Sequence, residues 1–96
     1  MDLRRLMTLK TVVEEGSFAR AANKLCCTQS TITFQIQQLE QELSLKLFEK
    51  IGRRMILTES GRNILPHVYE LMRVMDGLRQ AALDKDEPAG ELRVAT

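Results

Sequence analysis

The sequence predicts a mainly α-helical fold, in which three short helices are followed by a brief β-hairpin and one long helix. Apolar residues recur every three or four positions over residues 3–43, as on one face of a helix. They recur again about every 3.5 positions over residues 64–82, which is typical of a helix–helix seam. Between these stretches the apolar residues alternate around a glycine, which indicates a short hairpin.

Composition and length limit the class of protein. The 96 residues allow one domain, or one small domain with an extension, and 44% of them are hydrophobic, as in an ordinary globular protein. We find neither an 18-residue apolar stretch nor a signal core, so we expect a cytoplasmic protein without a membrane partner. Cys26 and Cys27 are adjacent, so a disulfide between them could not link distant segments of the fold. The sequence has no array of Cys and His residues with the spacing of a zinc site. We interpret the two cysteines as small buried or half-buried thiols rather than redox sensors, and predict no metal and no cofactor.

The net charge of +1 hides an uneven distribution. Residues 1–62 hold ten Lys and Arg against seven Asp and Glu, whereas residues 63–96 hold four against six. No acidic residue lies between positions 16 and 39. A negatively charged partner should therefore meet the first two-thirds of the chain.

The first two helices are predicted from their end signals. Apolar residues form a broad face over residues 3–15, and Gly16 suits the left-handed position that ends a helix. Ser17 suits the N-cap of a second, alanine-rich helix over residues 18–25, which another helix could cross closely. With a short turn and a polar helix after it, this pattern predicts a helix-turn-helix at about residues 18–37. The alternative is a generic three-helix bundle.

The polar helix over residues 28–43 organises the chain. Thr28 suits its N-cap, and a capped helix N-terminus attracts phosphate. One face is apolar, whereas the opposite face is polar and uncharged apart from one aromatic residue. Gln, Ser and Thr can hydrogen-bond with base edges, so we interpret this segment as a DNA-recognition helix, the alternative being a polar surface helix. The apolar face consists of Ile32, Ile36, Leu39 and Leu43, and the opposite face of Ser30, Phe34, Gln37 and Gln41.

A hairpin is predicted at about residues 47–57, with its turn at residues 51–53. Arg53 and Arg54 at its tip have no obvious role in a core. We interpret the hairpin as a wing whose arginines reach a phosphate or a minor groove. The alternative is that both arginines are simply solvated at the surface.

Thr58 suits the N-cap of a long helix over residues 59–83. The preceding small domain is too short to cover the whole apolar seam of such a long helix. We therefore infer that a second copy of the chain covers it in a homodimer. Pro66 removes one backbone donor, and we expect a kink there or fraying of the first two turns. The predicted seam consists of Ile64, Val68, Leu71, Met75, Leu78 and Ala82.

The C-terminal residues 84–96 combine a charged segment containing Pro and Gly with an alternating stretch that begins at Glu91. We interpret them as a hinge and the first strand of a further domain. The predicted organisation is therefore a winged helix-turn-helix domain at residues 1–58, a linker and dimerisation helix at residues 59–83, and this final segment.

One set of motifs spans the first two-thirds of the chain: Gly16-Ser17-Phe18, Ala21-Ala22, Leu25, Thr28-Gln29, Ile36, Leu39-Glu40, Leu43, Leu47-Phe48 and Leu57-Thr58-Glu59-Ser60-Gly61. Together they resemble the N-terminal domain of LysR-type bacterial transcriptional regulators over about residues 2–62. The resemblance extends in kind along the linker helix to about residue 85. It implies a winged helix-turn-helix, a linker helix that pairs two subunits, and a further domain from near Glu91 that binds a small-molecule effector. The full protein would be a dimer or a tetramer that regulates transcription.

The resemblance also assigns roles to residues. It places contacts to base edges and adjoining phosphates at Gln29, Ser30, Thr31, Thr33 and Phe34. It places a wing contact at Arg53, and phosphate-facing amides at the helix that starts with Ser17 and Phe18.

Five positions depart from the family pattern. Position 34 commonly holds a basic residue in the family and holds Phe34 here. The family commonly has proline, serine, glycine and arginine at the positions that are occupied here by Ser30, Thr33, Ser44 and Lys50, respectively. A left-handed cap at Ser44 would cost about 1 kcal/mol. We hypothesise that Phe34 packs against a thymine methyl group, the alternative being burial against the wing.

We compare three functions. The leading one is a transcriptional regulator that binds a dyad-symmetric site on duplex DNA as a dimer, with affinity that falls steeply with salt. The second is a dimerisation module that uses the 64–82 seam without DNA, and whose binding ignores salt. The third, an enzyme with a cysteine nucleophile, is disfavoured because no His or acidic residue lies near the cysteines in sequence.

Overall fold

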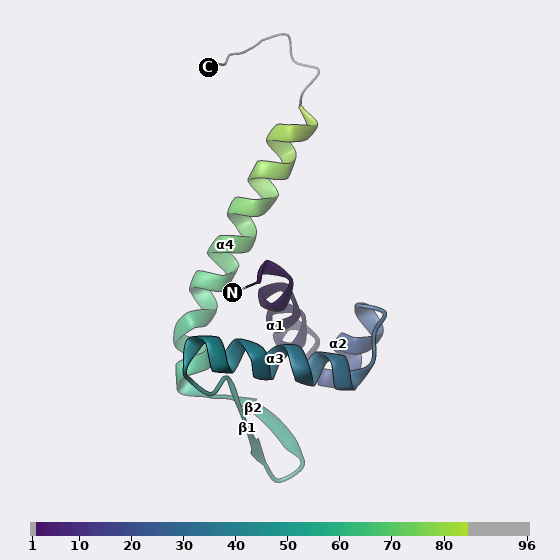
Figure 1. Cartoon of the computed structure of the whole chain (residues 1–96), viewed down its shortest axis with the longest axis vertical. Helices are drawn as coiled ribbons and strands as arrows, with labels where there is room; N and C mark the ends of the chain where they lie inside the picture. Colours follow the sequence, from purple (N-terminus) through teal and green to yellow (C-terminus); the bar gives the residue numbers. More distant parts are fainter. Residues whose placement is uncertain (1, 85–96) are drawn as a thin grey trace.

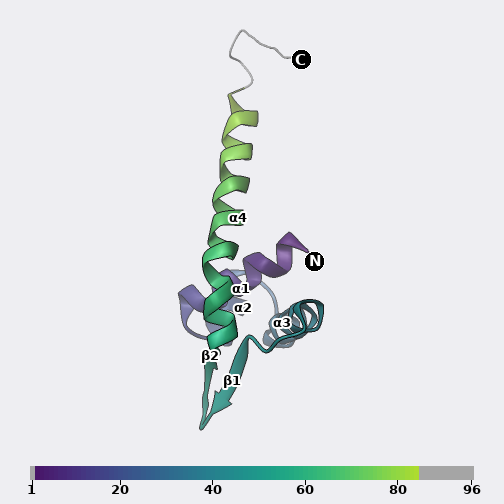
Figure 2. The same cartoon turned by 90° about the vertical axis from the view of Figure 1, so that its left-hand side faces the viewer.

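The computed structural model describes residues 2–84 as four helices and a two-stranded antiparallel sheet. Figures 1 and 2 show α1, α2 and α3 clustered together, with the hairpin projecting to one side and α4 extending the opposite way. The predicted mainly α-helical fold with a β-hairpin is therefore confirmed. The elements are α1 Leu3–Glu15, α2 Phe18–Lys24, α3 Gln29–Leu43, β1 Phe48–Ile51, β2 Arg54–Leu57 and α4 Glu59–Leu83.

Local signals set the helix ends, as predicted. The hydroxyl of Ser17 accepts a hydrogen bond from the Arg20 amide at 3.2 Å, and that of Thr58 accepts one from the Gly61 amide at 2.9 Å. Each hydroxyl satisfies an amide that has no partner inside its helix. Gly16 ends α1 with a φ of 77°, a conformation in which glycine is not strained.

One apolar core joins all the elements. The rings of Phe18 on α2 and Phe48 on β1 meet edge to face, with centroids 5.2 Å apart, which fixes the base of the hairpin against α2. Partly buried residues surround this core, including Leu25 after α2 and Leu43 at the end of α3. The buried apolar residues are Leu6, Leu9, Val12, Ala21, Ala22, Ile32, Ile36, Leu39, Leu47, Phe48, Val68 and Met72.

Two predicted boundaries shift slightly. Helix α2 ends at Lys24, and Leu25 is its C-cap rather than its last residue. The hairpin turn contains only Gly52 and Arg53, because Ile51 belongs to β1 and pairs with Arg54. Gly52 has a φ of 65° and Arg53 has no positive φ, as in a type II′ turn, whose twist suits a two-residue hairpin.

The first turns of α4 are helical, so of the two outcomes expected at Pro66, a kink or fraying of these turns, the fraying is wrong. The helix runs from Glu59 to Leu83 through Pro66 without a break. Thr58 caps its first turn, and Gly61 packs so closely on the hairpin that an added methyl group would lie 2.8 Å from the carbonyl oxygen of Leu47. These tertiary contacts hold the turns that precede the proline.

One residue of the predicted dimer seam needs correction. The side chain of Val68 is only 3% exposed and belongs to the core of its own chain, so it is not available to a second chain. Met72, one turn further along, is also buried in this core. The first half of α4 therefore packs on its own domain, mainly on α1.

Residues 85–96, where most of the hinge and the first strand of a further domain were predicted, lie outside the described residues. The predicted division into segments at residues 58 and 83 remains a prediction. Among the helices of residues 2–84, we find none with the length and apolar character needed to cross a membrane.

Candidate nucleic-acid interface

The rotation of α3 about its axis is fixed by its inner face. Ile32, Ile36 and Leu39 are buried, as the apolar stripe predicted. The half-buried Gln35 accepts a hydrogen bond of 2.5 Å from the buried Thr8 on α1. The opposite face is consequently turned outward, and all of its predicted residues, Ser30, Phe34, Gln37 and Gln41, are exposed.

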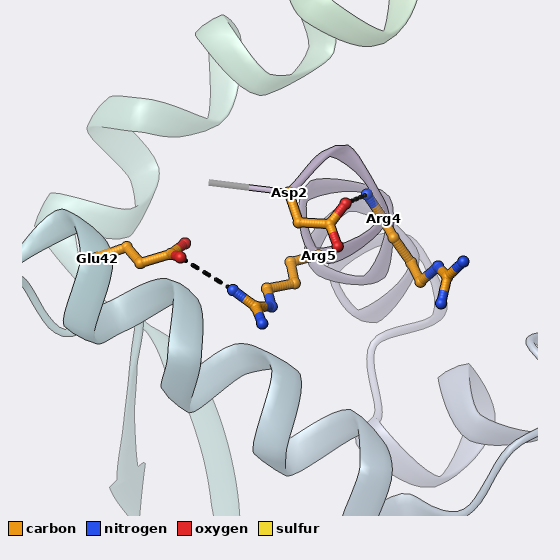
Figure 3. Close-up of polar contacts among 4 residues, drawn as sticks. All are labelled: Asp2, Arg4, Arg5 and Glu42. Carbon is orange, nitrogen blue, oxygen red and sulfur yellow. Dashed lines mark hydrogen bonds and ion pairs between the residues drawn. The ribbon is translucent and has the colours of Figure 1, made fainter.

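The two carboxylates of α3 are engaged with neighbouring elements. Glu40 accepts hydrogen bonds from the backbone amides of Leu47 and Phe48, at 2.8 and 3.3 Å, and so joins α3 to the start of the hairpin. Figure 3 shows Glu42 on α3 reaching Arg5 on α1, where an oxygen and a guanidinium nitrogen lie 3.0 Å apart. The outward face from Gln29 to Gln37 is left without any acidic side chain.

The N-terminus of α3 is exposed and capped. The Thr28 hydroxyl accepts a hydrogen bond of 3.1 Å from the Thr31 amide, and the two hydroxyls lie 3.0 Å apart. Both side chains are exposed at the start of the helix, where amides attract negative charge. This arrangement agrees with the predicted N-cap.

A groove separates the start of α2 and the first turns of α3 from the hairpin. It has a volume of about 680 Å³ and is open on one side. The groove brings together residues of three elements that were predicted as DNA contacts, and Lys50 and Met55 also line it. The predicted residues are Ser17 and Phe18 at the start of α2, Gln29 and Thr33 on α3, and Arg53 and Arg54 on the hairpin.

Three cations therefore gather on the hairpin. Lys50, Arg53 and Arg54 are all exposed, and across residues 2–84 none of them forms an ion pair. Lys50 was not among the predicted site residues. The alternation of side chains along a strand could have identified it. Lys50 lies two residues after the buried Phe48 and therefore on the same face of the hairpin.

A second, shallow depression continues this surface along α3. It is lined by Gln29, Ser30, Thr33, Phe34 and Gln37. Because Gln29 and Thr33 line both the groove and the depression, the predicted contact residues form one continuous surface, and only Thr28 and Thr31 line neither hollow.

The outer half of α4 carries a separate apolar surface. Leu71, Val74 and Leu78 are exposed by 45%, 57% and 69%, and Ala82 is exposed as well. Ile64 and Met75, also predicted for the seam, are half-buried against the core. Val74 was not among the predicted seam residues, because the prediction used only positions that alternate at steps of four and three residues from Ile64.

Nothing in residues 2–84 resembles a metal centre, since no three His, Cys, Asp or Glu side chains gather there. Both cysteines are free thiols, and Cys27 is half-buried as expected, but Cys26 is exposed, so the expectation of burial is wrong for Cys26. The cysteine pair therefore lies in the turn between α2 and α3, outside the groove and the depression.

Comparisons with known proteins agree with this geometry. The chain is 71% identical over 96 residues to an uncharacterized HTH-type transcriptional regulator, YfiE of Escherichia coli (strain K12), and this match covers the whole chain and 33% of YfiE. The structure is similar to that of the BenM DBD in complex with benA site 1 DNA, with a TM-score of 0.84 and 34% identity over 92% of this chain and 99% of that chain. It is also similar to the CbnR DBD in its DNA complex, with a TM-score of 0.75 and 32% identity over 88% of this chain and 99% of the other.

The chain spans about a third of the length of YfiE. These relatives are described as regulators or as DNA complexes rather than as enzymes, in line with the expectation that the chain is no enzyme. A family model described as bacterial regulatory helix-turn-helix protein, lysR family, matches residues 3–62, which is more than half of the sequence. The chain therefore belongs to the lysR family of bacterial regulatory helix-turn-helix proteins.

Proposed function

We propose that this chain binds a dyad-symmetric site on duplex DNA as a homodimer and thereby regulates transcription. One observation carries the proposal: the uncharged, hydrogen-bonding outer face of α3 adjoins three unpaired cations on the hairpin. Base edges in the major groove need donors and acceptors such as Gln29 and Ser30, whereas the phosphates need positive charge. The similarity of the structure to the BenM and CbnR DBDs, which are described in complex with DNA, supports DNA binding.

The proposed docking places α3 in the major groove with its N-terminal half against the bases. The hairpin then lies over the adjoining backbone, where Arg53 and Arg54 reach a phosphate or the minor groove. The amides at the starts of α2 and α3, beside Ser17 and Thr28, face phosphates.

The dimer is proposed to form through the outer half of α4. Leu71, Val74 and Leu78 recur at steps of three and four residues and are exposed in a single chain, so a second copy would cover them. A two-fold axis would then present two α3 helices to major grooves about 34 Å apart, or a multiple of that distance. The partner is thus duplex DNA on one surface and a second chain on the other.

The decisive experiment is selection from a pool of random duplex DNA, followed by titration of the selected site with salt. Enrichment of a dyad-symmetric motif, with affinity that falls steeply as salt rises, supports the proposal. Self-association that ignores salt, without enrichment of any motif, would favour the second candidate, a module that only dimerises through the exposed face of α4.

A single variant tests the role of the hairpin. We expect Arg53→Ala to lower the slope of log affinity against log salt by about one, because one phosphate contact is lost. Arg79→Ala is the matched control, since Arg79 is also exposed but lies on the outer half of α4. An equal loss of slope in both variants would contradict the wing assignment.

A transcriptional regulator works where the bacterial chromosome lies, so we propose a cytoplasmic location. The small-molecule effector implied by the family resemblance would act through a part of the protein outside residues 2–84.

A further inference from the structure

Phe34 is an apolar side chain placed in the centre of a polar recognition face. It is 56% exposed, and it is the only large hydrophobic residue of α3 that is so exposed. Around it in the depression lie Ser30 one turn before, Gln37 one turn after, and Gln29 and Thr33 beside them. Burial against the wing, the alternative considered for Phe34, is not observed, since most of the side chain is exposed and Phe34 does not line the groove beside the hairpin.

The position of Phe34 separates it from the phosphate contacts. Gln29 and Thr33 border both hollows, whereas Phe34, Ser30 and Gln37 border only the depression away from the hairpin. If the hairpin rests on the DNA backbone, the depression that Phe34 lines would face the bases. A phenyl ring neither donates nor accepts a strong hydrogen bond, so it cannot read the polar edges of a base pair.

The major groove presents one apolar group, the C5 methyl group of thymine. We infer that Phe34 is a specificity-determining residue that reads a 5-methylpyrimidine, thymine in an ordinary operator, at one step of each half-site. This inference rests on the proposed DNA-binding function and names the chemical group that the same surface selects. Burial of one methyl group against the ring strengthens binding about fourfold, and about fifteenfold when both half-sites of the dyad contribute.

The test removes the methyl group from the DNA. Deoxyuridine replaces each thymine of the selected operator in turn, which deletes the methyl group and keeps the pairing. For the unaltered chain we expect affinity to fall about fourfold at one thymine of each half-site. For Phe34→Ala the same deoxyuridine should leave affinity unchanged, because the methyl group then has no apolar partner to lose.

Four controls make the result specific. Phe34→Leu keeps an apolar side chain and should retain the response to deoxyuridine, whereas Gln41→Ala, an exposed neighbour on the same face, should respond like the unaltered chain. Where cytosine replaces that thymine, 5-methylcytosine should bind about fourfold better than cytosine, and only with Phe34 present. Sedimentation should show the same self-association for Phe34→Ala as for the unaltered chain.

The outcomes separate this inference from the function on which it rests. Specific, salt-dependent binding that is insensitive to deoxyuridine at every thymine would overturn the role of Phe34 and leave the DNA-binding proposal intact. An equal response to deoxyuridine in Phe34→Ala and the unaltered chain, or a change in self-association instead of in DNA binding, would also overturn it. Absence of any enriched motif would overturn both.

Discussion

Glu40 joins α3 to the start of the hairpin, and its removal should loosen both. Its Oε2 accepts the backbone amides of Leu47 and Phe48, whose side chains are buried. A hydrogen bond to a charged group contributes about 1.5–3 kcal/mol, and a buried amide left without an acceptor costs a similar amount. The bond of 3.3 Å is weaker and Glu40 is half-buried, so we expect Glu40→Ala to lower the free energy of unfolding by about 2–3 kcal/mol.

The assay is urea unfolding followed by circular dichroism, with all variants at one protein concentration because a dimer gains stability by mass action. Glu40→Gln keeps an acceptor oxygen and loses only the charge, so its loss should be about 1 kcal/mol. The exposed neighbour Gln41 supplies the control, and Gln41→Ala should stay within about 0.5 kcal/mol.

Amide exchange localises the effect. In Glu40→Ala the amides of Leu47 and Phe48 should lose protection more than those of the core of α1. A loss of stability no greater than that of Gln41→Ala, with protection unchanged at both amides, would refute the reasoning that this carboxylate holds the hairpin.

Three further predictions concern the scaffold. Ser44 has a φ of 56°, so Ser44→Gly should raise the free energy of unfolding by about 0.5–1 kcal/mol in urea unfolding, as left-handed strain outweighs the greater freedom of glycine in the unfolded chain. Gly61→Ala should lower it by about 1–3 kcal/mol despite better helix propensity, because the new methyl group meets the Leu47 carbonyl at 2.8 Å; a gain in stability would contradict this close packing. Burial first, and then the charge of Glu14, raise the pKa of Tyr69. The stability that this shift contributes is therefore fully present below the ordinary tyrosine pKa and is lost as pH rises from that pKa through the raised one. Ultraviolet titration should show Tyr69 ionising above its ordinary pKa, and Glu14→Gln should reduce that shift.

Local chemistry made much of the fold predictable. The caps at Ser17, Thr28 and Thr58 depend on a hydroxyl and an amide three residues apart, so the sequence alone specifies them. The left-handed cap at Ser44 also follows from its place after Leu43, the last apolar residue of α3.

The misses involve contacts between distant segments. Val68 fits the heptad pattern, but periodicity shows only that a residue is covered and not whether its own chain or a second chain covers it. Fraying before Pro66 was expected from the lost donor, whereas packing of Gly61 on the hairpin holds those turns. Lys50 joined the candidate site only once the hairpin register placed it beside the groove.

The outer half of α4 has a consequence for how folding and assembly depend on each other. Beyond Met75 the helix has little of its own domain to pack against, and exposed helical residues without tertiary contacts gain little from propagation alone. Gly77 lies in this outer half of α4 and costs about 1 kcal/mol of helix stability relative to alanine. The proposed second chain would supply the missing contacts, so helix completion and subunit pairing would proceed together. Dilution would then unwind the far end of α4 as well as separate the subunits, and the concentration of the regulator would control its shape along with its occupancy of DNA.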